Sequence, residues 1–383
     1  MTGRATERNF TSFLNVNITH VWFYLTRRKM SFFSAFLSIL VAILPSKNLM
    51  NNISGCEGEV QIGEVSVSTL PMCDRFRMKK FYIRKCFPVY YEYIVKCWNG
   101  SFDYISVTGT EGIGKSVFYI YFFERYRHEN PSITIVTASF YTNRKLKSCY
   151  VFHPGSTEGD MYRSIPVIKQ SVHLYDGAPH GEPEYQKMVC FTSPNYSWFD
   201  SLRKSEYHAR VYMPVWDMEE LFIANGSLGI GLDADLIRER FEAFGGVARY
   251  CLSLSPYFLQ QTEIQILDNL YEIDNLQKVQ KMLKFKSAGT AVLHRIFHMV
   301  PEYSLHPPFA GSFYFEFASE KAFHLFREAC HTPVNTDRNA FARRMENFPQ
   351  AKRFAVRMLD SYSTEQLCAK SGNSDLNDLD QER

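Results

Sequence analysis

The sequence lacks several features that would place it in a common class. Its 383 residues carry a formal net charge of only +3, which is too small to indicate a nucleic-acid partner by itself. The nine cysteines are spread along the chain and include no C-x-x-C pair, so their spacing gives no sign of a disulfide framework. Free, mostly buried thiols fit a reducing compartment at the place of action.

A hydrophobic run long enough to cross a bilayer is also missing. The most apolar stretch, FFSAFLSILVAIL, covers residues 32–44, whereas a spanning helix needs about 20 residues. Its length matches a signal-peptide core of about 7–15 residues, although such a core normally lies closer to the start of a chain. Two alternatives follow: a targeting segment with Met30 as the true start, or a buried or disordered helix in a leader.

Apolar and aromatic residues are abundant instead. Apolar residues make up 45% of the chain, aromatic residues 15% and charged residues 22%. This composition excludes a disordered chain. At this length it supports one large domain or two ordinary domains, each with its own core.

A glycine-rich motif marks the first candidate site. The strand-like segment YISVT (residues 104–108) runs into GTEGIGKS (residues 109–116), which fits G-x-x-x-x-G-K-S, and residues 117–128 continue as a helix. This order predicts a loop whose N–H groups hold phosphate, aided by the positive end of the helix. Lys115 would reach the β- and γ-phosphates and Ser116 would ligate Mg²⁺. The expected nucleotide-binding residues are Gly109, Thr110, Glu111, Gly112, Ile113, Gly114, Lys115, Ser116 and Val117. The alternative is a glycine-rich turn with a surface lysine.

Further strands should follow if this loop belongs to an α/β sheet. The candidates are ITIVTA (133–138), SVHLYD (171–176), MVCFTS (188–193) and RVYMP (210–214). The second ends at Asp176, at the carboxyl edge where open α/β sheets bind ligands. We therefore predict that Asp176 holds Mg²⁺ through water. In the alternative, Asp176 starts an ordinary turn in the string DGAP.

Two features of this edge bear on catalysis. Ser193 ends the next predicted strand and Asn195 follows it; either could sense the γ-phosphate or position water, unless SPN is an ordinary strand-ending turn. Asp176 is followed by Gly177 and Ala178 rather than by a glutamate, so the water-activating base is unidentified. Slow hydrolysis, or use of the nucleotide as a switch, would follow.

Helices are expected after the sheet. Residues 233–255 predict two helices around Gly245-Gly246, and residues 257–285 predict amphipathic helices of an all-α lid. Arg249, on the second helix, could reach the bound phosphates from this lid. The alternative is a solvent-facing or ion-paired arginine.

Two local patterns indicate structural roles. Asp217 in VWDMEELFIAN is expected to be an N-cap. His294 and His298 stand one helical turn apart, a spacing that also fits a zinc pair. No third ligand is evident, which favours core or surface histidines.

Longer strings carry a resemblance to a known family. They are GTEGIGKSVFYIYFFERYRHENPSITIVTASF, HLYDGAPHGEPEYQKMVCFTSPNYSWF, YMPVWDMEELFIAN, RFEAFGGVARYCLSL, AVLHRIFHMVP and FAGSFYFE. In their order and detail, these strings resemble the nucleotide-binding module of the Crinkler effectors of oomycete pathogens, which are related to the retrotransposon hot spot proteins of trypanosomes. The resemblance covers about residues 81–316.

The resemblance implies a fold and a set of roles. The fold would be an α/β P-loop NTPase of AAA-like or STAND-like kind, with a parallel sheet flanked by helices and followed by an α-helical lid. ATP and Mg²⁺ would be its cofactors. Lys115, Asp176, Ser193 and Arg249 would be catalytic, with Arg249 as the sensor arginine of an FGG-x-x-R pattern. Ser116 and Asp176 would hold the metal.

The resemblance also implies where such a protein acts. It would be secreted by a pathogen, enter host cells and act in the nucleus on a host protein or DNA; a cytoplasmic location is the alternative. Two departures limit this transfer. The amino-terminal LFLAK signature is absent, and residues 317–383 lack the D...E-x-K set of a nuclease. Since residues 311–316 resemble the opening of a restriction-endonuclease-like domain, Glu316 would be the remnant of a truncated one.

Four parts are therefore expected along the chain. They are a leader (1–75), a P-loop core (76–225), a helical lid (226–305) and a C-terminal region with the nuclease remnant and a disordered tail (306–383). The leading hypothesis is an ATP-binding and ATP-hydrolysing effector module whose nucleotide state controls its conformation or its partner. The alternatives are a nonhydrolysing nucleotide-dependent interaction protein, or the NTPase part of a nuclease-type toxin. The pattern accepts ATP or GTP and any oligomeric state.

Overall fold

The chain divides into two compact units, Met1–Val60 and Gln61–Arg383. The computed structural model describes residues 65–67, 80–183, 186–202, 205–271, 295–302, 312–336, 349–353 and 355–361, all within the second unit. The predictions for residues 32–44, for His294 and for the helix beyond residue 271 lie outside the described residues. Within them, no helix combines the length and apolar character that a membrane crossing requires.

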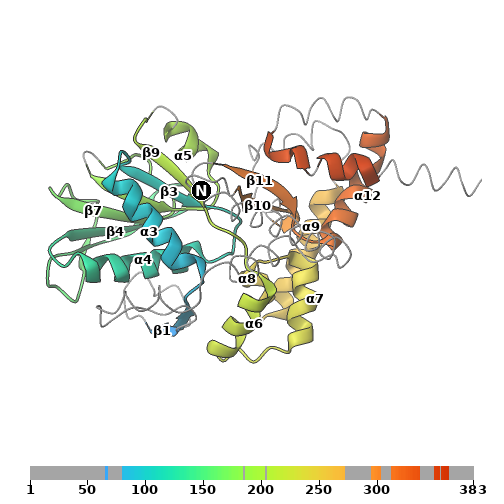
Figure 1. Ribbon diagram of the computed structural model, residues 1–383, viewed down its shortest axis with the longest axis horizontal. Helices are drawn as coiled ribbons and strands as arrows, with labels where there is room; N and C mark the ends of the chain where they lie inside the picture. Colours follow the sequence, from blue (N-terminus) through green and yellow to red (C-terminus); the bar gives the residue numbers. More distant parts are fainter. Residues whose placement is uncertain are drawn as a thin grey trace, which may run out of the picture. The chain divides into compact units, whose positions relative to one another are not determined.

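The largest sheet of this unit has seven strands (Figure 1). Its order is β6-β5-β4-β7-β8-β3-β9. Strands β4, β7, β8, β3 and β9 are parallel to one another, β5 pairs antiparallel with β4, and β6 pairs antiparallel with β5. The strands are β3 (Tyr104–Thr108), β4 (Thr134–Phe140), β5 (Leu146–Phe152), β6 (Asp160–Tyr162), β7 (Ser171–Asp176), β8 (Lys187–Phe191) and β9 (His208–Tyr212). All five predicted strands are confirmed, and a mostly parallel α/β sheet results.

Both faces of the parallel strands are covered. In β8, Val189 and Phe191 join the main core on one face, whereas Met188 and Cys190 join a second cluster with Trp198 on the other. Burial on two faces requires nearly continuous apolar strands, which is why these segments stand out in the sequence.

Aromatic side chains join the helices to the sheet. Helices α3 (Cys86–Asn99) and α4 (Lys115–Glu129) pack against each other through Tyr91 and Phe122, whose ring centroids are 4.9 Å apart. Phe118 of α4 then meets Phe191 of β8 at 5.5 Å in an edge contact. On the other face, the short helix α5 (Tyr196–Ser201) contributes buried Trp198. The helix that carries the end of the glycine motif is therefore fixed firmly on the sheet.

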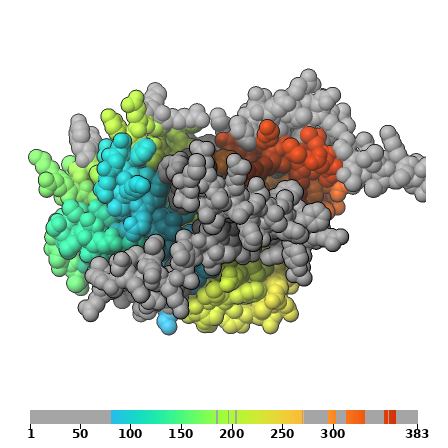
Figure 2. Space-filling view, viewed as in Figure 1, coloured from blue at the N-terminus to red at the C-terminus, as the bar shows by residue number. Residues whose placement is uncertain are grey.

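Helices follow the sheet, as expected. They are α6 (Met218–Ser227), α7 (Ala234–Phe244), α8 (Ala248–Cys251) and α9 (Pro256–Tyr271). The N-cap prediction is confirmed, because the Asp217 side chain accepts a hydrogen bond from Glu220 N at 2.7 Å. In the space-filling view α6 and α7 form one continuous surface, coloured lime to yellow (Figure 2).

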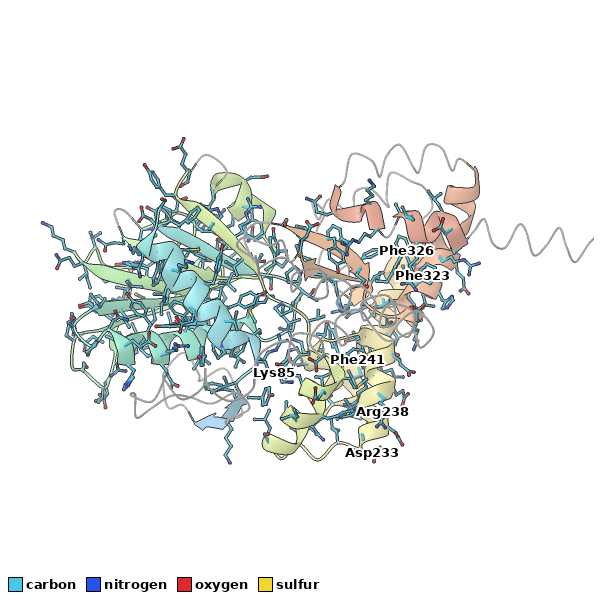
Figure 3. The ribbon with its side chains drawn as sticks, viewed as in Figure 1. Lys85, Asp233, Arg238, Phe241, Phe323 and Phe326 are labelled. Carbon is cyan, nitrogen blue, oxygen red and sulfur yellow. The ribbon has the colours of Figure 1, made fainter. Side chains whose placement is uncertain are left out.

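A β-hairpin, which the sequence did not predict, comes next. Strands β10 (Phe297–Pro301) and β11 (Phe313–Phe317) pair antiparallel, and α12 (Glu320–Thr336) and a 3₁₀ turn (Pro349–Ala351) follow. Helix α12 presents Phe323 and Phe326 to the hairpin (Figure 3), with ring centroids 5.1 Å from Phe317 and 5.0 Å from Phe297, respectively. A second two-stranded sheet joins β1 (Val65–Val67) and β2 (Lys80–Tyr82).

The helical spacing assigned to His298 is therefore wrong. His298 lies in β10, where the apolar residues Phe297, Met299 and Pro301 alternate with it along the strand. This period-two pattern was hidden because the spacing of two histidines also fits one helical turn. The expected all-helical segment thus contains a strand.

Candidate phosphate-binding site

The glycine loop, residues 109–116, connects β3 to α4. Gly109 and Gly112 have φ angles of 135° and 85°, in a region that residues with a Cβ rarely adopt. A Cβ on Gly109 would lie 2.8 Å from the carbonyl oxygen of Met213, and one on Gly112 would lie 2.8 Å from Val247 Cγ1. Glycine is needed at both positions for the backbone path and for the close approach of neighbouring segments.

Free backbone donors collect at the start of α4. The N–H groups of Gly114, Lys115 and Ser116 donate no hydrogen bond to any acceptor within the described residues. The first N–H groups of a helix have no partner inside the helix and carry a partial positive charge. The loop therefore presents the donors that an anion would accept.

The Lys115 side chain folds back over the loop. Its Nζ donates to the carbonyl oxygens of Gly109 at 3.0 Å and Thr110 at 2.7 Å, and the residue is only 7% exposed. Burial lowers the pKa of Lys115 to about 7, and the positive charge of Arg249 acts in the same direction. The negative charges of Glu111 and Asp176 partly oppose this shift. The ammonium group is thus held beside the loop in a site that disfavours its charge.

Ser116 and Asp176 meet across the sheet edge. Ser116 Oγ donates to Asp176 Oδ1 at 3.0 Å. Asp176 is the last residue of β7 and pairs in register with Phe191 of β8, the strand that separates β7 from β3. One hydroxyl and one carboxylate are hard oxygen ligands of the kind that Mg²⁺ takes from proteins, so these residues fit a magnesium site.

Arg249 reaches the loop from α8. Its Nη1 donates to Glu111 Oε1 at 2.7 Å, and its backbone N donates to the Gly112 carbonyl oxygen at 3.3 Å. This approach is tight, because a Cβ on Gly112 would lie 3.0 Å from Arg249 Cβ. The Arg249 side chain is ion-paired, as the alternative interpretation of the sequence proposed, and its partner Glu111 belongs to the loop.

Ser193 is not joined to these residues. It follows β8 and is exposed, and within the described residues its side chain makes no hydrogen bond with Lys115 or Asp176. Asn195 is the N-cap of α5, where its Oδ1 accepts from Trp198 N at 3.1 Å. The strand-ending turn therefore accounts for Asn195, and Ser193 stays a candidate by its place at the sheet edge alone.

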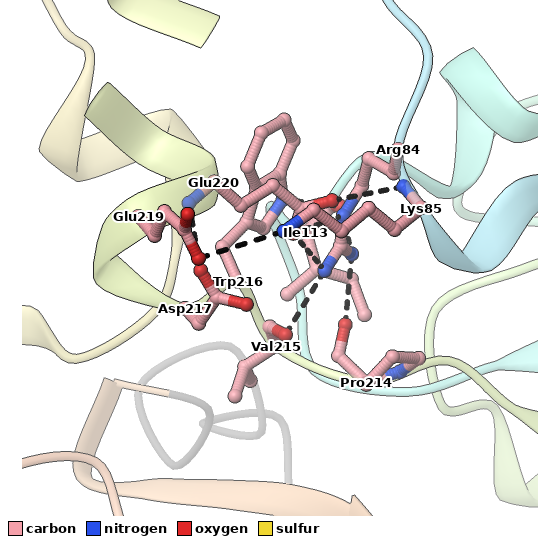
Figure 4. Close-up of polar contacts among 9 residues, drawn as sticks. All are labelled: Arg84, Lys85, Ile113, Pro214, Val215, Trp216, Asp217, Glu219 and Glu220. Carbon is pink, nitrogen blue, oxygen red and sulfur yellow. Dashed lines mark hydrogen bonds and ion pairs between the residues drawn. The ribbon is translucent and has the colours of Figure 1, made fainter. Parts of the chain in front are cut away.

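A buried ion pair supports the loop from behind (Figure 4). Arg84 Nη2 lies 2.8 Å from Glu220 Oε2, with both side chains almost fully buried. Arg84 Nη1 also donates to the Ile113 carbonyl oxygen at 3.3 Å, and Trp216 Nε1 donates to the same oxygen at 2.8 Å. No local pattern predicts this group, because Arg84 and Glu220 are 136 positions apart.

The hairpin also contacts the loop. Met299 N donates to Thr110 Oγ1 at 2.9 Å, a buried bond between residues 189 positions apart. His298 beside it is buried, its Nε2 has no partner in the described part of the chain, and burial lowers its pKa to about 4. Within that part, no three His, Cys, Asp or Glu residues gather as a metal centre would require. His298 is therefore a core residue here, and Glu316 lies opposite it on β11.

The sequence-predicted residues divide accordingly. The fold brings Lys115, Ser116, Asp176 and Arg249 together around the glycine loop, and Ser193 lies outside this set. The comparisons add no relative: no family model matches the sequence, and no curated protein matches it closely enough to indicate a relationship.

Proposed function

We propose that the chain is a P-loop NTPase that binds a nucleoside triphosphate, ATP in the first place, together with Mg²⁺ at the glycine loop. The 3.0 Å contact between Ser116 Oγ and Asp176 Oδ1 carries this proposal. This contact joins the end of the loop to Asp176, the acidic residue that the sequence places at the end of the buried strand β7. A glycine turn with a surface lysine would not require this partner, nor would its lysine be buried.

Each residue has a role in the proposed binding. The N–H groups at the start of α4 and the Lys115 ammonium would hold the β- and γ-phosphates. Ser116 and Asp176 would hold Mg²⁺, which when bound neutralises charge on the phosphate oxygens. Arg249 would contribute a second positive charge from α8. Together these groups would position a triphosphate and stabilise its charge, which is most of what phosphoryl transfer asks of a protein.

A nonhydrolysing switch is the second candidate. Gly177 and buried Ala178 follow Asp176, where a carboxylate would have to stand to activate water directly from this strand. Glu182, further along, is exposed. The nucleotide would then control a partner by binding alone. A secreted effector that acts on a host nuclear protein or DNA, of AAA-like or STAND-like kind, remains a proposal supported by the Crinkler resemblance.

Binding is tested by replacing the loop lysine. We expect Lys115→Ala to abolish uptake of a fluorescent ATP analogue in the presence of Mg²⁺, because the variant loses the ammonium group that lies on the carbonyl oxygens of Gly109 and Thr110. Lys147→Ala removes the same charge from an exposed position on β5 and is the matched control. Equal binding by Lys115→Ala and the wild type would refute the proposal.

Turnover is measured separately. Phosphate release from ATP by the wild type supports hydrolysis, whereas tight binding without release supports the switch. Nicking of plasmid DNA in the presence of Mg²⁺ would instead favour the nuclease-type alternative, and we expect none.

A further inference from the structure

The Glu111–Arg249 ion pair lies directly on the proposed phosphate site. Glu111 is part of the glycine loop, and Arg249 Nη1 lies 2.7 Å from its Oε1. The backbone of Arg249 is anchored independently, through its N–H on the Gly112 carbonyl oxygen. The side chain can therefore change partner while α8 stays docked on the loop.

Both side chains have room to move. The Arg249 side chain is 48% exposed and the Glu111 side chain 30% exposed. An ion pair with this much solvent contact is weak, whereas a triphosphate with its higher charge offers a guanidinium several acceptor oxygens. A phosphate group in the loop would compete well for Arg249.

The carboxylate also opposes the ligand by its charge. Apart from burial, the charges of Glu111 and Arg249 act on Lys115 in opposite directions, and that of Asp176 acts with Glu111. Lys115, Glu111 and Arg249 therefore form one coupled set around the loop. The Glu111 carboxylate neutralises Arg249, whose positive charge a phosphate group would otherwise use.

We propose that Glu111 is an internal competitor of the nucleotide: it holds Arg249 while the loop is free and releases it to the phosphates on binding. This inference rests on the proposed function. Glu111 acts through Arg249 and is a positioning residue. Binding would thereby be reported at α8, because a loop-to-helix ion pair is broken each time a nucleotide enters.

The test is a double-mutant cycle read out with a ribose-labelled fluorescent ATP analogue and Mg²⁺. Glu111→Gln is expected to bind about two- to fivefold more tightly than the wild type, the range that a partly exposed ion pair supports. Arg249→Gln is expected to bind more weakly. In the double variant most of the gain from Glu111→Gln should disappear, since no arginine remains to be released.

A charge-retaining variant separates this role from a merely structural one. Arg249→Lys keeps a positive charge on α8, so part of the gain from Glu111→Gln should return when it is combined with Arg249→Lys, whereas Arg249→Gln should not restore it. Glu263→Gln is the matched control: it breaks a similar half-exposed ion pair with Lys321, 3.0 Å long, away from the loop. It should leave the affinity unchanged.

The outcomes distinguish this inference from the function on which it rests. If the wild type binds and Glu111→Gln binds no better, or if its full gain persists with Arg249→Gln, the competitor role is overturned and nucleotide binding stands. If no variant binds, both fail. Binding by Glu111→Gln alone, with none by the wild type, would support both strongly.

Discussion

At the scale of single residues, Lys115 predicts a proton coupled to nucleotide binding. Its pKa of about 7 means that about nine in ten of these side chains are neutral at pH 8. Phosphates beside Nζ favour the ammonium form and raise this pKa, so binding at pH 8 should take up nearly one proton. Titration calorimetry in two buffers with different ionisation enthalpies measures this uptake. A binding heat that does not depend on the buffer would contradict it.

The same pKa has a consequence for stability. Its folded value lies below the ordinary value of 10.5, so the unfolded chain binds more protons than the folded one between about pH 7 and pH 10.5. The contribution of Lys115 to the free energy of unfolding therefore rises with pH through this window.

Sequence reasoning selected residues that local patterns mark, and the structure brings Ser116 and Asp176 into contact. Lys115 and Ser116 follow from the fixed loop pattern, and Asp176 from its place at the end of a buried strand. Glu111 occupies a position where the pattern accepts any residue, and its partner is 138 positions away. Arg249 could be chosen only through a resemblance, because nothing local distinguishes a phosphate ligand from an ion-paired side chain.

At the scale of elements, the turn between α7 and α8 packs closely against the backbone of Trp216. A Cβ on Gly246 would meet the backbone oxygen of Trp216 at 2.0 Å, and backbone cannot move aside as a flexible side chain can. Gly246→Ala should lower the free energy of unfolding by about 1–3 kcal/mol, measured by urea denaturation.

Gly226→Ala in α6, with open space around its Cβ, is the matched control. It should be neutral or stabilising by up to about 1 kcal/mol. Similar effects of the two variants would count against tight packing at this turn.

The elements that the sequence predicted well share a physical property. The inner parallel strands β3, β4, β7 and β8 are largely buried and so are mostly apolar, whereas the edge strand β9 alternates buried and half-buried residues. Strands β5 and β6 escaped prediction because they lie toward one edge of the sheet, where polar and apolar residues mix and all three residues of β6 are exposed. In the segment 294–298, the spacing of two histidines suggested a helix and concealed the alternation of a strand. That strand pairs with β11, which begins only at Phe313.

At the scale of the whole molecule, the glycine loop is contacted by residues from distant parts of the described chain. Arg84 supports it from before β3, Arg249 from the helices after the sheet, and Met299 from the hairpin. A change in the loop on binding therefore reaches three separate parts of the sequence. This arrangement suits a protein whose nucleotide state controls a partner, whether or not hydrolysis follows.

The bond between Thr110 and Met299 has a consequence for biosynthesis. These residues are 189 positions apart, so at about 5–20 residues per second the ribosome needs about 10–40 s to add the second after the first. For the part of that interval after Tyr212 has been added, the chain contains every strand of the sheet but still lacks this contact of the loop. Ribosome-stalled chains of increasing length should retain a fluorescent ATP analogue only once Met299 has emerged. Equal retention by chains that end before residue 295 would show that the loop matures without the hairpin.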